Sequence, residues 1–516
     1  MSHKFLVFIV LFLLGSILPA QGLEESTRYS TQGLGGSTRS LGSANAYGAI
    51  GGDFICGSIN PAGLALNRKA ELHLGININS NATQSSYIGS PQQGDVNIGL
   101  GLANAGITIN GFIRDNAGKR VSDGLTNVVF SFGYNRHSDY RSSFVYSGVN
   151  KQSSFTDYLA ENANGQDYKD MNIYSLGYLS YMSYLIEPKI NYDDSFASAI
   201  ASPITNVRQN NTVTRSGSGG DYNLSFAGDF SNRFYFGMGL LIRSQRFTES
   251  FQFFENDLQP TTDTNVYESM AYSRYLNTKA NGVGFNIGGL VKATQNLRFG
   301  ISYATPIVVK ATDKYTQKLT STFDNSRGNI PEKTYTYSTP DNDFDGKPDT
   351  LQYKYKISTP AKLTLSGAYI FEKKGFISID LERVNYASSK LIPVDDPTYL
   401  FTSENEQIRT IYKAVWNLRI GAEYVYDKYR FRAGYAMNPS PYSDNRPSQV
   451  AKLNRNFYTV GLGYYEKGYS LNAAVLVSAS KENYTPYKLN LGRTYYAAEI
   501  KNSFVSFQVG ATIVVH

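Results

Sequence analysis

The chain has 516 residues and carries 49 Lys and Arg against 42 Asp and Glu, which gives a formal net charge of +7. Hydrophobic residues make up 41% and charged residues 18%; this balance excludes a disordered chain, and the lack of a second long apolar run excludes a bundle of membrane-spanning helices. The basic residues are scattered, so no nucleic-acid partner is expected. With 41 Tyr, 29 Phe and 46 Gly, the composition favours strands joined by tight turns.

Residues 1–20, MSHKFLVFIVLFLLGSILPA, are typical of a secretory signal peptide that is cleaved after Ala20. Lys4 lies before an apolar run, and small residues follow that run. A membrane anchor helix is the alternative, but the run is short for one. Removing this segment deletes one Lys and no acidic residue, so the net charge falls from +7 to +6. The only cysteine, Cys56, cannot form an intrachain disulfide, so the exported fold holds without one.

Residues 21–69 form an N-terminal segment that is too rich in small residues for a strand and too apolar for a plain linker. It contains RSLGSANAYGAIGG at 39–52 and, within GSINPAGLAL at 57–66, the turn signal Asn60-Pro61-Ala62. We expect a compact plug, or hatch, in which Gly33, Gly35 and Gly36 permit tight turns. A disordered leader is the alternative.

From residue 70 onward, several segments alternate strictly between apolar and polar or small residues, as half-buried strands do. In FYFGMGLLIR, for example, Phe234, Phe236, Met238, Leu240 and Ile242 share one face. The same pattern occurs in LRFGISYA at 297–304, in WNLRIGAEYVY at 416–426 and in the last strand, around residue 509. The pattern predicts an all-β body in which each strand has one apolar and one polar or small face.

The links between these strands decide between a soluble sandwich and a barrel. Short links lie at 229–233, 292–296, 371–375, 426–429 and 465–468. Long links lie near 81–94, 148–212, 249–270, 313–350, 388–409, 439–456 and 481–500, and only the link near 113–125 breaks the alternation. Short turns at one end and long loops at the other are typical of outer-membrane barrels, whereas Greek-key sandwiches lack this rhythm. We predict a 14-stranded antiparallel transmembrane β-barrel over residues 70–516, with residues 21–69 as a hatch in its lumen.

Residues 341–349, DNDFDGKPD, have the spacing of a calcium loop. Asp341, Asp343, Asp345 and Asp349 supply carboxylates and Lys347 a backbone carbonyl, at loop positions 1, 3, 5, 9 and 7. Gln352 stands where an EF-hand has its bidentate Glu, so we expect only weak Ca²⁺ binding that stiffens an extracellular loop. An acidic turn without an ion is the alternative.

The sequence gives little support for an enzyme. Its four histidines are His3, His73, His137 and His516, and no serine elbow, HExxH or Walker loop is present. Asp380 and Glu382 point the same way on one strand; paired carboxylates can do acid/base work, but we expect a hydrated lumen network with residues such as Arg419. No cofactor is expected for activity.

The N-terminal stretch TQGLGGSTRSLGSANAYGAIGGDFICGSINPAGLAL resembles the hatch of FadL-type outer-membrane transporters of long-chain fatty acids and other hydrophobic compounds. Asn60, Pro61 and Ala62 match the NPA signature of that family. The segments LRFGISYATPI, TPAKLTLSGAYIF and WNLRIGAEYVYDKYRFRAGYAMNPSP resemble its barrel strands. Two departures are the single acid in Gly52-Asp53-Phe54, where the family has paired acids, and the C-terminal Val515-His516, where many barrels end in an aromatic residue.

The resemblance implies a passive transporter in the cell outer membrane, with lipids and a hydrophobic small-molecule ligand as its partners. The ligand would be captured outside and passed inward through a hatch-plugged barrel. FadL-like barrels also serve as subunits of an outer-membrane protein secretion machine, which is the alternative function. A general porin is disfavoured by the predicted hatch. No ligand-contacting residue is assigned.

Overall fold

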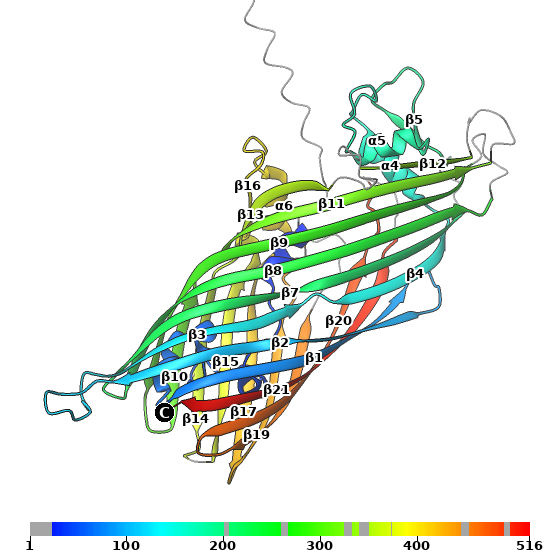
Figure 1. The fold of residues 1–516 in the computed structure, drawn as a ribbon. Coiled ribbons are helices and arrows are strands. Elements are labelled where there is room, and N and C mark those ends of the chain that lie inside the picture. The colour runs from blue at the N-terminus through cyan, green and yellow to red at the C-terminus, as the bar shows by residue number, and fades with distance from the viewer. Residues whose placement is uncertain are drawn as a thin grey trace, which may run out of the picture.

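The computed structural model describes residues 23–515 except 201–205, 260–266, 325–332, 340–349, 373, 445–453 and 490–495. Nineteen of the described strands form one antiparallel sheet that closes on itself, because β1 pairs with β21 from Ala70↔Val515 to Ser86↔Glu499. Closure pairs the backbone N–H and C=O groups of strands that would otherwise face hydrocarbon unpaired, each at a cost of several kcal/mol. Figure 1 shows the resulting elongated barrel.

The strands of the wall run in chain order around the barrel. They are β1 (Ala70–Ser86), β2 (Gln93–Phe112), β3 (Leu125–Asp139), β4 (Ser142–Asn150), β7 (Val207–Phe230), β8 (Phe234–Asp257), β9 (Tyr267–Lys292), β10 (Leu297–Ala304), β11 (Val308–Phe323), β13 (Leu351–Ser358), β14 (Lys362–Ile370), β15 (Gly375–Asn385), β16 (Lys390–Pro393), β17 (Ala414–Tyr426), β18 (Tyr429–Asn438), β19 (Arg455–Tyr465), β20 (Tyr469–Tyr484) and β21 (Ala498–Val515). Four successive pairs, β3–β4, β10–β11, β13–β14 and β15–β16, each occupy one strand position, and β12 (Thr334–Ser338) pairs only with β11. The described residues therefore form the predicted closed barrel of fourteen strand positions.

The two ends of the barrel differ as the links predicted. Tight turns at 231–233, 293–296, 427–428 and 466–468 lie at the end that also holds Ala70 and Val515; we call this the short-turn end. The link at 113–124, which broke the predicted alternation, lies at the same end. The long links lie at the opposite, long-loop end.

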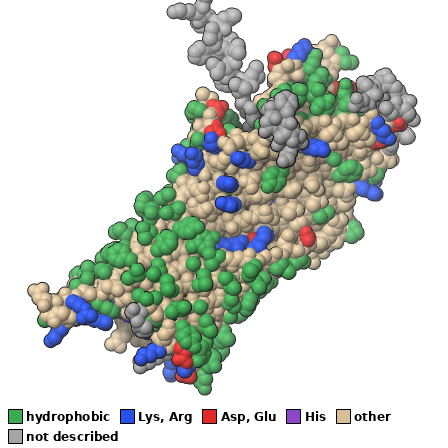
Figure 2. Space-filling view, in the orientation of Figure 1, with side chains coloured by type: hydrophobic (Ala, Val, Ile, Leu, Met, Phe, Trp, Pro, Cys, Tyr) green, Lys and Arg blue, Asp and Glu red, His purple; other side chains and the backbone are tan. Residues whose placement is uncertain are grey.

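An apolar band surrounds the half of the barrel nearer the short-turn end. On β8 the outward residues Phe234, Phe236, Met238 and Ile242 are 42–55% exposed, which confirms the face predicted for this strand. Eight residue steps of a tilted strand span about 20 Å, close to the apolar height of outer-membrane barrels. Figure 2 shows hydrophobic side chains dense over this half and sparse over the other.

The strands continue well beyond the band. The predicted link at 249–270 is mostly strand, since β8 runs to Asp257 and β9 begins at Tyr267, and the predicted link at 313–350 contains the end of β11. Above the band most outward residues are polar, with exceptions such as Phe254 and Tyr275, so strand pairing continues without the regular apolar alternation that marks it in the sequence. None of the described helices is long and apolar enough to cross a membrane.

Within the predicted link at 148–212, residues 151–200 form a folded cap over the long-loop end. It contains α4 (Phe155–Ala163), α5 (Leu176–Met182), β5 (Ile186–Pro188) and β6 (Phe196–Ser198). Ser154 and Asp157 form a capping box at the start of α4. The helices bury aromatic and aliphatic residues against the extended strands β7, β8 and β9, so the cap and these strands share one hydrophobic cluster.

A buried carboxyl joins the cap to the wall. Glu255, beyond the apolar band on β8, accepts hydrogen bonds from the N–H of Phe155 (3.0 Å) and from Gln209 Nε2 (2.7 Å), and it also contacts the Ser154 hydroxyl. Burial raises the pKa of this carboxyl to about 7, although these donors act in the opposite direction.

We expect the cap to lose stability as the pH rises. A raised carboxyl pKa means that the folded state holds its proton more tightly than the unfolded state, so stability falls between the unfolded pKa, near 4.5, and the folded value of about 7. The loss amounts to about 3 kcal/mol. Hydrogen exchange of α4 amides, corrected for the intrinsic pH dependence of exchange, should show this loss between pH 5 and pH 8, and Glu255→Gln should abolish it. Equal pH dependence in both proteins would contradict the assignment.

Candidate transport site

The N-terminal segment lies inside the barrel, where Figure 1 shows it in dark blue. It comprises α1 (Leu23–Ser30), α2 (Thr38–Leu41), α3 (Cys56–Ile59) and the 3-10 helix η1 (Pro61–Leu66), joined by irregular backbone. Its apolar residues are almost fully buried against the wall. Polar side chains of the wall satisfy its backbone; Asn286 Nδ2 donates to the carbonyl of Gly57 (2.7 Å) and Ser302 Oγ to that of Ile59 (2.8 Å).

Asn60, Pro61 and Ala62 form the contact that the sequence singled out. Asn60 Oδ1 accepts from the N–H of Ala62 (3.2 Å), and its Nδ2 donates to the carbonyls of Gly48 (2.7 Å) and Gly289 (3.2 Å). One side chain thus caps η1, ties it to an earlier part of the segment and fixes both to β9. A Cβ atom on Gly288 would lie 2.0 Å from Asn60 Oδ1, so the wall is shaped to admit this residue.

The glycines at 33, 35 and 36 do not form the tight turns that we predicted. The segment has no turn there, and the left-handed backbone occurs at Gly51 and Gly52. A Cβ on Gly35 would lie 1.9 Å from the carbonyl oxygen of Arg136. Small residues at these positions therefore serve close approach to the wall.

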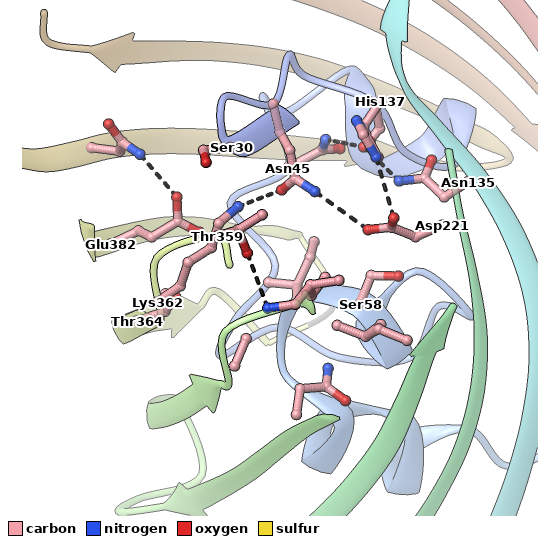
Figure 3. A pocket seen from close by; sticks show the side chains of 18 of the residues that line it. Ser30, Asn45, Ser58, Asn135, His137, Asp221, Thr359, Lys362, Thr364 and Glu382 are labelled. Atoms are coloured by element: carbon pink, nitrogen blue, oxygen red, sulfur yellow. Dashed lines mark hydrogen bonds and ion pairs between the residues drawn. The ribbon is translucent and has the colours of Figure 1, made fainter. Parts of the chain in front are cut away.

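A polar cavity of about 100 Å³ lies between the N-terminal segment and the inner wall (Figure 3). Asp221 of β7 accepts two hydrogen bonds from Arg243 of β8, both 2.9 Å, and lies 3.3 Å from Nε2 of His137. Gln32 of the N-terminal segment donates to the same carboxylate (3.3 Å). The carboxylate of Glu382 contacts Asn417 (2.9 Å) and Arg419 (3.2 Å), which confirms the lumen network expected for this residue.

Lys362 is the unusual group in this cavity. Its Nζ donates to Gln32 Oε1, and no described carboxylate lies within ion-pair distance of it, because Asp221 and Glu382 pair with arginines. Lys362 is half-buried, and an ammonium that is partly shielded from solvent and lacks a carboxylate partner is unfavourable unless another anion can reach it. The cavity therefore offers one cationic position for an acidic group.

The wall beside this cavity is incomplete. β2 pairs with β3 only between Asn104↔Asn135 and Phe112↔Asn127, and residues 93–102 of β2 pair with β1 alone. β4 instead lies on the lumen side of β1. The inward side chain of Asn81 on β1 donates to the carbonyl of Arg141, immediately before β4 (2.8 Å), and that of Thr83 donates to the carbonyl of Ser143 in β4 (2.5 Å). These bonds draw β4 inward and leave a gap between β2 and the β3–β4 strand position.

An outward groove of about 730 Å³ begins at this gap. Its apolar lining comes from β1, β2, β3 and β7 and includes Leu72, Leu102, Ile107, Phe132, Tyr134 and Tyr222. Arg136, His73 and Ser218 supply its polar atoms. Arg136 and Tyr222 border the groove while their sequence neighbours His137 and Asp221 line the cavity, so groove and cavity lie back to back across the wall.

A charged cluster fills the gap. Asp139 Oδ2 lies 3.0 Å from Arg136 Nη2 and 2.6 Å from Arg141 Nη2, and it accepts a hydrogen bond from Asn79 (2.6 Å). The guanidinium groups lie over glycines of β2; a Cβ on Gly99 would coincide with that of Arg141, 1.1 Å from its Nη1. The gap is thus sealed by side chains rather than by backbone pairing.

We expect Asp139→Ala to lower the free energy of unfolding by about 2–3 kcal/mol, because it leaves two guanidinium groups without their carboxylate. The expected loss of stability is smaller than the loss caused by breaking a fully buried ion pair, because the Arg141 side chain is 25% exposed. Denaturant unfolding in detergent should show the loss. Glu406→Ala, which removes a surface ion pair to Arg409, should cost no more than about 1 kcal/mol. Equal losses in the two variants would show that the cluster does not brace the gap.

An aromatic residue of the N-terminal segment touches the wall behind the groove. The ring of Phe54 lies 4.9 Å, centroid to centroid, from the ring of His73, which lines the groove. Cβ atoms on Gly106 and Gly133 would lie 2.5 and 2.7 Å from Phe54 Cδ2. Movement of the N-terminal segment would therefore reach the wall beside the gap through this ring.

The predicted calcium loop, Asp341, Asp343, Asp345, Lys347 and Asp349, lies outside the described residues, as does the predicted signal peptide at 1–20. In the part of the chain that the structure describes, no group of three metal-ligating side chains occurs. Calcium binding by the loop stays a prediction. Isothermal titration with Ca²⁺ should give a dissociation constant of about 10⁻⁴ to 10⁻³ M that is lost in Asp341→Asn/Asp345→Asn.

The sequence did not reveal Lys362, Arg136, Asp139 or Arg141 as site residues. The one available signal was the row of glycines at 99, 101 and 106 in a strand, since glycine in a strand often marks close approach of another group. Which groups approach them depends on pairings between distant strands, which the local pattern does not contain.

Comparison with known proteins identifies the family. Residues 30–485 match the family described as outer membrane protein transport protein (OMPP1/FadL/TodX). No curated protein matches the chain in sequence.

Among solved structures, a Pseudomonas aeruginosa FadL homologue is similar over 94% of this chain and 99% of its own, at 15% identity with a TM-score of 0.54, so the two share a fold. The P. putida toluene transporter TodX matches over 94% and 99% of the two chains, at 14% identity with a TM-score of 0.48. Because the family match covers most of the chain, the protein belongs to the OMPP1/FadL/TodX family of outer-membrane transporters of hydrophobic compounds, which are not enzymes.

Proposed function

We propose that the protein carries long-chain fatty acids, or similar acidic amphipathic molecules, across the outer membrane. The observation that carries the proposal is Lys362, a half-buried cation without a described carboxylate partner, in a cavity that lies back to back with an apolar groove. A neutral hydrocarbon would leave this cation unpaired. A carboxylate beside it would form a charge-assisted hydrogen bond.

The sizes of the cavity and the groove support a ligand whose head group lies in the cavity and whose acyl chain lies in the groove. The polar cavity of about 100 Å³ has room for a head group, whereas the groove of about 730 Å³ lies within the roughly 300–1,000 Å³ range of small-molecule pockets. Each methylene group that enters the groove contributes about 0.8 kcal/mol. The ligand would leave sideways through the gap when the Arg136–Asp139–Arg141 cluster opens, and no nucleotide or cofactor is needed.

In this proposal residues 21–69 are a hatch and residues 70–516 the barrel, after removal of a signal peptide at 1–20. The hatch is supported by the close fit of Asn60 and Phe54 to wall glycines. It keeps small solutes from crossing while an amphipathic ligand uses the gap.

Binding and lipid analysis test the proposal directly. The protein is extracted in detergent, and co-extracted lipophiles are identified by mass spectrometry; binding of palmitate, hexadecanol and toluene is then compared. We expect co-extracted long-chain acids and tighter binding of palmitate than of hexadecanol. Preference for toluene, or equal binding of acid and alcohol, would overturn the assignment of substrate class.

The alternative, a subunit of a protein secretion machine, is supported by the exposed tip of the cap. Ile190 is 88% and Tyr192 61% exposed in the link between β5 and β6, and apolar side chains so exposed on an extracellular cap suit a protein partner. A photo-crosslinking residue at position 190, activated in intact cells, tests this. A single stable protein adduct together with no lipophile in the purified protein would favour secretion over transport.

A further inference from the structure

Five outward-facing cations form a patch on β8, β9, β11 and β13, immediately beyond the apolar band. We call Arg246, Lys279, Lys310, Lys314 and Lys356 the basic patch; all five side chains are exposed. On the outward face of β11, Lys310 lies two positions beyond Val308, which is the last exposed apolar residue on that face. Arg246 and Lys279 lie four positions beyond Ile242 and Val283, respectively, which correspond to about 10 Å in height on a tilted strand. Figure 2 shows Lys and Arg side chains over this part of the wall.

The strand register sets these cations directly opposite one another. Arg246 is the cross-strand partner of Lys279, and Lys310 is the partner of Lys356. Lys279 is also paired with Thr312, which lies between Lys310 and Lys314 on β11. Like charges directly opposite each other destabilise a sheet, so this arrangement works against folding unless an anion bridges them.

In the part that the structure describes, no acidic side chain forms an ion pair with the patch; Asp395, beside β13, lies 4.0 Å from Lys354 instead. The acidic residues of these strand stretches, Glu249 and Asp313, are buried and point into the barrel, where Glu249 pairs with Arg215 and Arg274. The outward residues of β8 from Ser244 to Phe254, and those of β9 and β11 facing them, include no Asp or Glu. Within the described residues, no ion pair is formed by any of the five patch cations.

The height of the patch indicates where its anion comes from. Headgroups occupy roughly 5–8 Å on each side of a hydrocarbon core, and the patch begins just above the core on the long-loop side. In an outer-membrane barrel that side faces the outer leaflet. A row of cations that continues the edge of the apolar band is placed for a lipid whose acyl chains lie against the band and whose head carries phosphate.

We propose that the basic patch binds phosphate groups of outer-leaflet glycolipid. The phosphates bridge the opposed pairs Arg246–Lys279 and Lys310–Lys356, so a bound lipid relieves the repulsion within the sheet. A protein partner is less suited to this surface, because the patch borders the acyl region and lies on the side of the barrel wall rather than on the exposed loops. The proposal is independent of the transported substrate, since these residues line neither the cavity nor the groove.

The test uses the full-length mature protein in detergent and lipid A that carries two phosphates, with the same lipid after dephosphorylation as a second probe. Arg246→Gln/Lys279→Gln/Lys310→Gln/Lys356→Gln removes four charges from the patch. The matched control, Lys151→Gln/Lys189→Gln/Lys413→Gln/Lys488→Gln, removes four exposed charges elsewhere on the long-loop end.

We expect the patch variant to bind phosphorylated lipid A at least ten-fold more weakly than the wild type, and the control variant to stay within two-fold. Wild-type binding should weaken as NaCl is raised, and dephosphorylated lipid should bind equally to all three proteins. Without lipid, the patch variant should unfold at a temperature no lower than the wild type, because a repulsion has been removed. If that variant does not fold, Lys279→Gln/Lys310→Gln replaces it, with a drop of at least three-fold expected. Equal binding of the two lipids by the wild type, or an equal drop in patch and control variants, would overturn the proposal.

Discussion

Replacing Gly288 with valine is expected to release the N-terminal segment from the wall and to make the barrel permeable to small sugars. The new side chain begins where Asn60 now sits, since a Cβ on Gly288 would lie 2.0 Å from Asn60 Oδ1 and 3.0 Å from Cδ of Pro61. Overpacking of this kind costs about 1–3 kcal/mol, and displacing Asn60 also removes its bonds to Gly48 and Gly289. Sugar-driven swelling of liposomes measures the opening.

The neighbouring glycine provides the control for this prediction. Gly289 points to the outside of the barrel, where the nearest atom to an added Cβ is Ile301 Cγ2 at 3.7 Å. Gly289→Val should therefore leave the barrel closed. Permeability that rises equally in both variants would show that valine disturbs β9 itself, and permeability that rises in neither would show that Asn60 does not hold the segment in place.

Replacing Lys362 with methionine is expected to weaken palmitate binding about 10- to 100-fold while changing hexadecanol binding less than about three-fold. Methionine keeps most of the volume of lysine but removes the only cavity cation that lacks a described carboxylate partner. Hydrogen bonds to charged groups contribute about 1.5–3 kcal/mol, which corresponds to this range of affinity. Calorimetry in nanodiscs measures both ligands under the same conditions.

Lys413→Met serves as the control, because Lys413 is exposed and lies outside both cavity and groove. It should bind both ligands like the wild type. A Lys362→Met protein that binds palmitate as tightly as the wild type would remove the argument for an acidic ligand. Equal weakening for acid and alcohol would indicate a structural role for Lys362 instead.

The sequence was sufficient for the architecture because the membrane imposes a simple pattern on each strand. Phe234, Phe236 and Met238 alternate with small or inward residues, and their exposure in the structure follows that alternation. The rhythm of the links placed the two ends correctly, and Asn60-Pro61-Ala62 marked the contact between the N-terminal segment and the wall. Each of these features is a local pattern in the chain.

Local patterns in the sequence could not predict the site. The gap arises because Asn81 and Thr83 bind the backbone at Arg141 and Ser143, at the start of β4 and 60 residues away in the chain. Lys362 is distinctive only because Asp221 and Glu382 are already paired with arginines from other strands. Both features depend on which distant strands meet. The cap was missed for another reason: its elements are short, and its apolar residues pack on strand extensions that carry no apolar alternation on their outer face.

The route of the ligand is the central claim, and photo-crosslinking measures it most directly. A long-chain fatty acid that carries a diazirine at the end of its chain is bound to the reconstituted protein and activated, and the labelled peptides are mapped. We predict labels on the groove residues of β2, β3 and β7, such as Leu102 and Tyr134, and their loss when unlabelled palmitate is added. Labels confined to the short-turn end of the N-terminal segment, around Ile50 and Leu66, would show that the ligand passes straight through the barrel and would contradict the account.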